Sequence, residues 1–272
     1  MTSALDQVAS WPLQASVGVA DRHGVLALTA GSEVRLPWAS VTKLVTALAA
    51  QVAIEEGTVS LDAPAGPPGA TLRHLLAHAS GLPLDGTAPI AKVGSRRIYS
   101  NSGIEVAAEA VAVAAGMTFN NYVRDGVLGP LGMAATTLGA SAAWGAMGPL
   151  VDLLALGVEL LAPTVIAPAT LAAATAVAYP GLSGVLPGFG PQVHNDWGLG
   201  FEIRDHKSPH WTGSGNSPGT FGHFGRSGSF LWVDPAVGLV CAGLADRPFG
   251  PWAVEAWPAL SDAVLASFRA RD

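Results

Sequence analysis

The stretch Leu36-Pro37-Trp38-Ala39-Ser40-Val41-Thr42-Lys43 leads directly into the apolar run Leu44-Val45-Thr46-Ala47-Leu48-Ala49-Ala50. Residues three apart on a helix are neighbours in space, so the Ser40 hydroxyl and the Lys43 amine are expected to lie together. A serine becomes a useful nucleophile when a nearby base takes its proton. A lysine that is buried near its serine loses charge through desolvation and can act as that base.

Composition predicts a globular protein. The 272 residues suffice for one large core or two linked lobes, and half of them are apolar. The longest stretch without a charged side chain covers residues 160–195, and five prolines interrupt it. Its first half is expected to be a buried helical region, because a membrane span needs about 20 strongly apolar residues. Residues 1–7 have neither the basic start nor the apolar core of a secretory signal.

Charge and cysteine content narrow the function classes. The net charge is −6 and the basic residues are scattered, which argues against a nucleic-acid surface. The single cysteine, Cys241, excludes an internal disulfide. It lies in an apolar run at residues 237–242, where a silent core thiol is expected. Together these features favour a cytoplasmic protein without a membrane span.

Local patterns predict β-rich ends and a helical middle. A hairpin is expected at residues 16–20 and 25–28, and a helix at 72–78, with Thr71 as its N-cap and Gly81 as its stop. The other expected elements are a helix at 105–115 closed by Gly116, a linker at 180–191, strands at 199–203, 229–233 and 238–242, and a last helix at 253–269.

This order of elements predicts two lobes. Residues 1–39 and 192–272 are expected to form an α/β lobe, and residues 40–191 a helical lobe inserted into it. Ser40 then lies at the junction of the lobes, and clefts between lobes are favoured places for small-ligand sites.

Two further stretches carry chemistry that a serine–lysine site needs. In Tyr99-Ser100-Asn101 a phenol and a carboxamide lie two residues apart, and in an extended segment such residues point the same way. Gly222-His223-Phe224-Gly225-Arg226 is a Gly-rich strand edge. Such an edge lets substrate and backbone N–H groups approach closely.

In these features the chain resembles the serine β-lactamase and penicillin-binding-protein superfamily, in particular its class C-like branch. That branch includes class C β-lactamases, D-stereospecific peptidases and family VIII esterases. The resemblance is carried, in matching order and spacing, by residues 39–43 (ASVTK), 71–83 (TLRHLLAHASGLP), 99–103 (YSNSG) and 221–229 (FGHFGRSGS), with smaller echoes at 128–133 (LGPLGM) and 197–201 (WGLGF). It implies a mixed α/β (α+β), β-lactamase-like fold, in which an antiparallel sheet is flanked by helices and carries an inserted all-helical lobe.

The resemblance also implies catalytic roles. Ser40 is the expected acylated nucleophile, and Lys43 and Tyr99 are expected to share general-base work and proton delivery to the leaving group. The backbone N–H groups of Ser40 and Arg226 are expected to form the oxyanion hole. Neither a metal nor an organic cofactor is expected.

The substrate-binding residues implied in the same way are Asn101, His223, Phe224 and Gly225. Asn101 is expected to hydrogen-bond a carbonyl or amide of the substrate. His223 begins the third motif, where many members have Lys and some have His.

Two departures from the family pattern bear on the substrate. Members that handle penicillins or peptide C-termini usually have a small hydroxyl residue at the position of Phe224, where it helps to hold a carboxylate. With His223 the site also lacks the permanent charge of Lys, and charge-assisted hydrogen bonds are about twice as strong as neutral ones. Arg226 can replace part of that charge. The sequence therefore favours a carboxylesterase or amidase that acts on small, uncharged acyl substrates.

Three alternatives remain open at this point. One is a β-lactamase or D-alanyl-type peptidase, and another is a non-catalytic member that keeps the fold as a binding or scaffold module. The third is an α/β-hydrolase, because residues 215–219 (GNSPG) spell a nucleophile elbow. Pro218 has no N–H to donate to an oxyanion, so this last match is interpreted as chance.

His74 and His78 have the spacing of two zinc ligands on a helix. A zinc protease has Glu after the first His, and Leu75 stands there instead. Both are expected to be structural, with His78 capping the Ser80-Gly81 turn.

Overall fold

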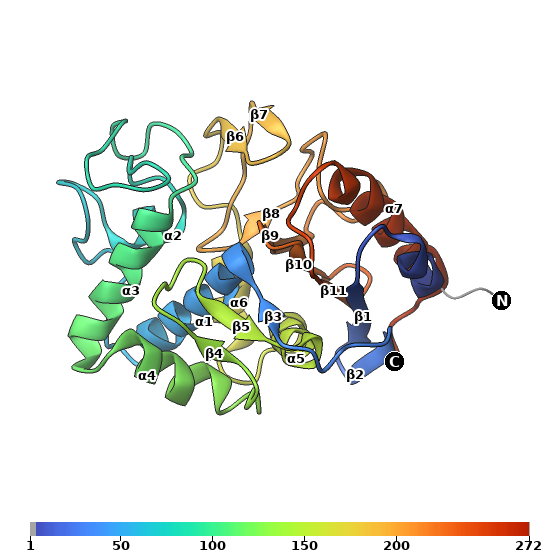
Figure 1. Cartoon of the computed structure of the whole chain (residues 1–272). Coiled ribbons are helices and arrows are strands. Elements are labelled where there is room, and N and C mark those ends of the chain that lie inside the picture. The colour runs from blue at the N-terminus through green and yellow to red at the C-terminus, as the bar shows by residue number, and fades with distance from the viewer. Residues whose placement is uncertain (1–3, 272) are drawn as a thin grey trace.

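A six-stranded antiparallel sheet forms the centre of the protein, of which the computed structural model describes residues 4–271 (Figure 1). The strand order is β2–β1–β11–β10–β9–β8. The bounds are β1 (Ala15–Asp21), β2 (Gly24–Leu28), β8 (Glu202–Ile203), β9 (Phe221–Gly225), β10 (Ser229–Asp234) and β11 (Leu239–Ala245). Strand β1 pairs with β11, so both ends of the chain contribute to one sheet, and the predicted hairpin β1–β2 is confirmed.

Helices cover both faces of this sheet, as the predicted fold class requires. Helix α5 (Leu150–Leu161) packs on β1, β10 and β11. A Cβ at Gly157 would lie 2.4 Å from the Val240 side chain, so a residue without a side chain lets α5 lie close to the sheet. On the other face, α7 (Pro251–Ser267) and η1 (Ala4–Ser10) enclose a second apolar cluster. Cys241 is buried in that cluster, as expected, and burial raises the pKa of its thiol.

The remaining helices gather beside the sheet. They are η2 (Ala39–Val41), α1 (Thr42–Glu55), α2 (Leu72–Leu76), α3 (Asn101–Ala115), α4 (Phe119–Val123), η3 (Arg124–Leu128) and α6 (Pro168–Thr175). Helix α1 is the central one, with every residue from Thr42 to Ala53 buried. Two small sheets complete the fold: β3 (Leu36–Pro37), β5 (Ala146–Gly148) and β4 (Thr137–Leu138) form one, and β6 (Gly184–Leu186) and β7 (Gly190–Gln192) the other. Helix α5 lies within the range expected for the helical lobe, yet it packs on the sheet.

Several predicted boundaries need correction. Helix α2 ends at Leu76, before the predicted stop, because His78 adopts a left-handed backbone with φ of 54°. Helix α3 begins at Asn101, four residues earlier than predicted, because the Ser100 side chain accepts a hydrogen bond from Gly103 N and caps it.

Three β-rich or loop segments also differ from expectation. Residues 180–191, predicted to be a linker, contain the hairpin strand β6 and the start of β7. The predicted strand at 199–203 is reduced to β8. The last helix runs two residues earlier than predicted at each end. Of the N-terminal segment at 1–7, residues 1–3 lie outside the described part, and the rest belongs to η1.

Among residues 4–271, no single helix has the length and apolar character of a membrane span. Residues 101–115 and 119–128 reach that length and composition only as a pair, and the two are bent by 83° at their junction.

A buried ion pair stabilises the segment that leads into β9. Lys207 and Glu202 are in direct contact, and their side chains are 0% and 2% exposed. Glu202 also accepts hydrogen bonds from Trp211 Nε1 and pairs with His210 Nε2, each at 3.0 Å. Removing one partner from such a pair leaves a buried charge without compensation.

We therefore expect Lys207→Met to lower the free energy of unfolding by about 3–5 kcal/mol, because it strands the Glu202 carboxylate. Urea unfolding followed by tryptophan fluorescence measures this change. Arg124→Met is the matched control, since it removes a cation from the exposed Arg124–Asp125 pair. Equal unfolding midpoints for the two variants would contradict this account of the pair.

Candidate active site

Ser40 lies in the short helix η2, at the point where it passes into α1. Ala39, the residue before it, has φ of 44°, an uncommon backbone conformation for a residue with a side chain. The end of β9 packs against this turn. A Cβ on Gly225 would lie 2.5 Å from Trp38 O, and Ser229 Oγ donates to the same carbonyl at 2.7 Å. Only glycine at position 225 lets the strand approach Ser40 so closely.

Lys43 is buried directly behind Ser40. Its Nζ lies 3.4 Å from Ser40 Oγ, 2.8 Å from Asn101 Oδ1 and 2.9 Å from Ala143 O. Burial lowers the pKa of Lys43 to about 7, although the carboxylates of Glu105 and Asp85 act in the opposite direction. An amine with this pKa is part neutral at neutral pH, which suits a general base.

The carbonyl of Ala143 is held in place by a partly buried carboxylate. Glu105, on α3, accepts hydrogen bonds from the backbone N–H groups of Ala142 and Ala143 at 3.2 Å and contacts the Ser141 hydroxyl. Sequence analysis did not identify Glu105, because a glutamate within an Ala-rich helix carries no motif of its own.

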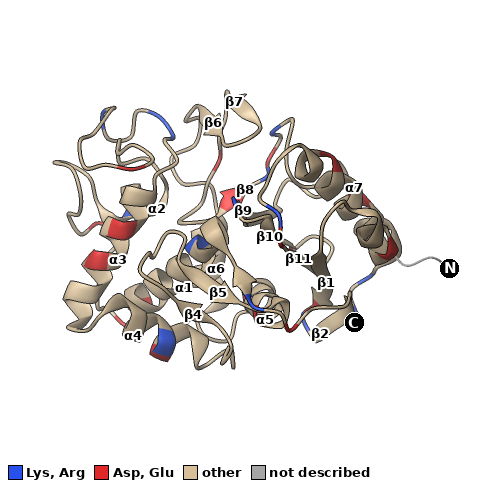
Figure 2. Ribbon diagram, viewed as in Figure 1, with Lys and Arg blue, Asp and Glu red and all other residues tan. Residues whose placement is uncertain are grey.

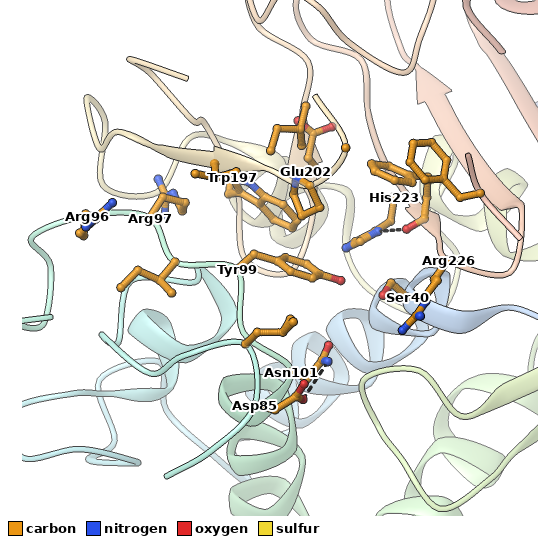
Figure 3. A pocket seen from close by; sticks show the side chains of 18 of the residues that line it. Ser40, Asp85, Arg96, Arg97, Tyr99, Asn101, Trp197, Glu202, His223 and Arg226 are labelled. Carbon is orange, nitrogen blue, oxygen red and sulfur yellow. Dashed lines mark hydrogen bonds between the residues drawn. The ribbon is translucent and has the colours of Figure 1, made fainter. Parts of the chain in front are cut away.

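Tyr99 forms one wall of the site. Its ring lies 4.7 Å from Lys43 Nζ and packs against Trp197 and His223, with centroid distances of 5.8 and 5.6 Å. Burial raises the pKa of the Tyr99 hydroxyl, and its contact with the Ser40 side chain opposes that shift. Tyr99 therefore keeps its proton at neutral pH. Figure 3 shows the hydroxyl pointing into the space in front of Ser40.

His223 approaches the same space from β9. Its Nδ1 donates to Phe224 O at 2.6 Å, which fixes the tautomer and leaves Nε2 as an acceptor. Burial, with help from the charge of Lys43, lowers the pKa of His223 to about 3. This side chain is therefore neutral at physiological pH, in contrast to a lysine at the same position.

Asn101 and Asp85 complete the polar part of the site. Asn101, the first residue of α3, donates from Nδ2 to Asp85 Oδ1 at 3.1 Å (Figure 3). Ser100, between Tyr99 and Asn101, is extended, and α3 starts at Asn101 itself; both side chains line one cavity. Asp85 was missed because a single aspartate in a Gly/Pro-rich loop resembles any turn residue.

These residues surround one cavity of about 610 Å³, which Ser40, Tyr99, Asn101, His223, Phe224 and Arg226 all line. Its outer rim carries the exposed apolar side chains of Leu84, Ile90 and Val185. Phe224 packs on Phe249, with ring centroids 5.0 Å apart, and forms part of an aromatic wall. Arg226 lies beside Ser40 in Figure 3.

The two histidines at zinc-ligand spacing do not share a site. His74 caps α2 together with Thr71 and stacks on Tyr179. His78 accepts a hydrogen bond from Ser100 N through Nδ1, so it holds the residue before Asn101; the expectation that it caps the Ser80-Gly81 turn is wrong. Within residues 4–271, no group of three or more His, Cys, Asp or Glu side chains is arranged to hold a metal ion.

Comparison with known proteins identifies the family. The Beta-lactamase family model matches residues 9–265, so the chain belongs to this family of serine hydrolases. A beta-lactamase from Mycobacterium bovis shares 50% identity, with 97% of this chain and 98% of that chain covered and a TM-score of 0.96. No curated protein matches the chain.

More distant structures share the fold. Simvastatin synthase LovD from Aspergillus terreus has 17% identity and a TM-score of 0.80, with 97% of this chain and 96% of that chain covered. EstCE1, a hydrolase with promiscuous acyltransferase activity, has 19% identity and a TM-score of 0.75, with 96% of each chain covered.

The reactivity of Ser40 is expected to follow the protonation of Lys43. Because burial places the Lys43 pKa at about 7, the base is lost as pH falls below that value. The rate at which a fluorophosphonate labels Ser40 should be level above about pH 8 and fall about ten-fold per unit below pH 6. A rate that stays flat down to pH 5 would exclude Lys43 as the base. Lys43→Ala should label slowly at every pH.

Proposed function

We propose that the protein is a carboxylesterase or amidase that acts on small, uncharged acyl substrates through a Ser40 acyl-enzyme. The observation that carries this proposal is the buried Lys43 amine, 3.4 Å from Oγ of Ser40, which lines a cavity with an apolar rim. A nucleophile next to a base whose pKa lies near 7 suits acyl transfer at neutral pH.

In the proposed reaction, Ser40 Oγ attacks the carbonyl carbon and its proton passes to Lys43 Nζ. The backbone N–H groups of Ser40 and Arg226 stabilise the oxyanion. When the tetrahedral intermediate collapses, Tyr99 gives its proton to the departing oxygen or nitrogen and regains one from Lys43. Water then attacks the acyl-enzyme and loses a proton to Lys43. As the bond to Ser40 Oγ breaks, that proton returns to Oγ and the acid leaves.

The preference for uncharged substrates rests on His223 and Phe224. His223 is neutral, so it supplies no fixed charge for a substrate carboxylate. Phe224 places an aromatic ring in the cavity wall, where a small hydroxyl would offer a hydrogen bond. Arg226 and the exposed Arg96 also line the cavity, and either cation can attract an anionic group.

A β-lactamase activity is the second candidate. It is favoured by the 50% identity to the beta-lactamase from Mycobacterium bovis. Hydrolysis of a chromogenic cephalosporin, and release of D-alanine from a D-alanyl dipeptide, measure this candidate and the related D-peptidase directly.

The first test is hydrolysis of p-nitrophenyl butyrate by the wild-type protein and by Ser40→Ala. We expect the variant to lose activity by about 10⁴-fold or more, because it lacks the nucleophile, and to keep the melting temperature of the wild type. Turnover at an equal rate in the variant would end the proposal. Labelling of Ser40 by a covalent serine probe distinguishes a silent scaffold from an enzyme with another substrate.

A second prediction concerns the choice between neutral and anionic substrates. Phe224→Thr should raise kcat/KM for a chromogenic cephalosporin, relative to p-nitrophenyl butyrate, by about three- to ten-fold, because it adds a hydroxyl beside His223. Replacing the ring by a smaller side chain leaves a gap in the aromatic wall, which can lower activity on every substrate. The ratio of the two kcat/KM values cancels such a general loss. A ratio that stays constant or falls would show that Phe224 does not set this preference.

A further inference from the structure

Asp85 is held rigidly at the cavity although its side chain is exposed. Hydrogen bonds attach the backbone on both sides of it to the start of α3: Ser100 Oγ donates to Pro83 O at 2.6 Å, Asn101 N to Leu84 O at 2.8 Å, and Gly86 N to Ser102 Oγ at 2.9 Å. A loop residue with this support keeps its position without help from its own side chain. These backbone hydrogen bonds therefore fix where the Asp85 carboxylate lies.

The orientation of the Asn101 amide follows from its two neighbours. The protonated Lys43 amine can only donate, so it faces Oδ1, and the Asp85 carboxylate can only accept, so it faces Nδ2. One of the two amide N–H bonds is therefore already taken. A substrate carbonyl that approaches here meets one remaining N–H and, beside it, a carboxylate that repels it.

Asp85 also lacks a cationic partner. Its carboxylate forms no ion pair with any basic side chain in residues 4–271, and it accepts a hydrogen bond from Asn101 Nδ2. The remaining acceptor capacity of a carboxylate, which can take several donors, is available to a ligand in the cavity. Leu84 and Ile90, on the same segment, line the same cavity as Asp85, so an acyl chain packed against them lies in the space that the carboxylate faces.

We propose that Asp85 is a specificity-determining residue that favours acyl groups with a hydrogen-bond donor a few atoms from the carbonyl that Ser40 attacks. The donor is a hydroxyl or an ammonium group. This inference rests on the proposed acyl-enzyme function and names its substrate class more closely. An acyl group with only an acceptor at that place is disfavoured, because two acceptors face each other there. Charged residues of both signs are scattered over the whole fold (Figure 2).

The test compares p-nitrophenyl esters that differ in one substituent. The set is butyrate, 2- and 3-hydroxybutyrate, 2- and 3-aminobutyrate, and 3-methoxybutyrate as the acceptor-only member. Each kcat/KM is divided by that for butyrate in the wild type and in Asp85→Asn. Comparing these ratios between the two proteins cancels the intrinsic reactivity of each ester.

We expect the best aminobutyrate ratio to fall about ten-fold in Asp85→Asn, and the best hydroxybutyrate ratio about three-fold, because the variant replaces a charged acceptor by a neutral one. The methoxybutyrate ratio should stay or rise. A loss confined to the aminobutyrates identifies the donor as ammonium, and a loss in both series identifies a general preference for donors. Asp125→Asn, which removes an exposed carboxylate elsewhere, is the matched control and should leave every ratio unchanged.

The outcomes separate this inference from the proposed function. If Asp85→Asn changes all esters by the same factor, Asp85 acts only by positioning Asn101 and Lys43, and the specificity role is wrong. If Asp85→Asn changes kcat/KM for none of the esters, the specificity role is wrong as well. If Ser40→Ala removes no activity from any ester, the proposed function itself fails, and the inference fails with it.

Discussion

The site depends on the cost of burying one ammonium group. Lys43 lies in the fully buried part of helix α1, among residues that are mostly apolar. Desolvation there lowers the pKa of its amine well below the usual value for lysine. Three oxygen atoms, from a serine, an asparagine and a backbone carbonyl, compensate part of that cost. The balance leaves an amine that changes charge near neutral pH. The carboxylates of Glu105 and Asp85 favour the charged form of this amine and so raise its pKa.

The rest of the fold serves to hold this arrangement together. The sheet delivers His223 and Gly225 to one side of Ser40, and α3 delivers Asn101 to the other. Buried Arg97 joins the segments between them, because its guanidinium donates to the carbonyls of Asn195 and Ala178 and also contacts Ala77 O. Such a residue fixes backbone that has no regular secondary structure, and much of the cavity wall is backbone of this kind.

The sequence predicted the fold class and the principal side chains because they lie in short, ordered motifs. Ser40 and Lys43 are three residues apart on a helix, and the motifs around Tyr99 and His223 carry the resemblance to the family that implied their roles. The lobe division and the site roles remain predictions. Asp85, Glu105 and Arg97 could not be found in this way, since each acts through contacts with residues far along the chain. The start of α3 was predicted too late because the Ser100 side chain accepts a capping hydrogen bond from Gly103 N.

The pairing of β1 with β11 also constrains how the protein is made. Strand β1 is synthesised before the helical region, and its partner β11 is synthesised after that region. Contacts so distant in sequence form slowly, because a long loop has to close first. The nascent chain therefore carries α1, with Ser40 and Lys43, before β9 exists to cover them. Until β9 has been made, the cavity wall that His223 and Phe224 supply is missing, so the site around Ser40 is completed only after the helical region has been synthesised.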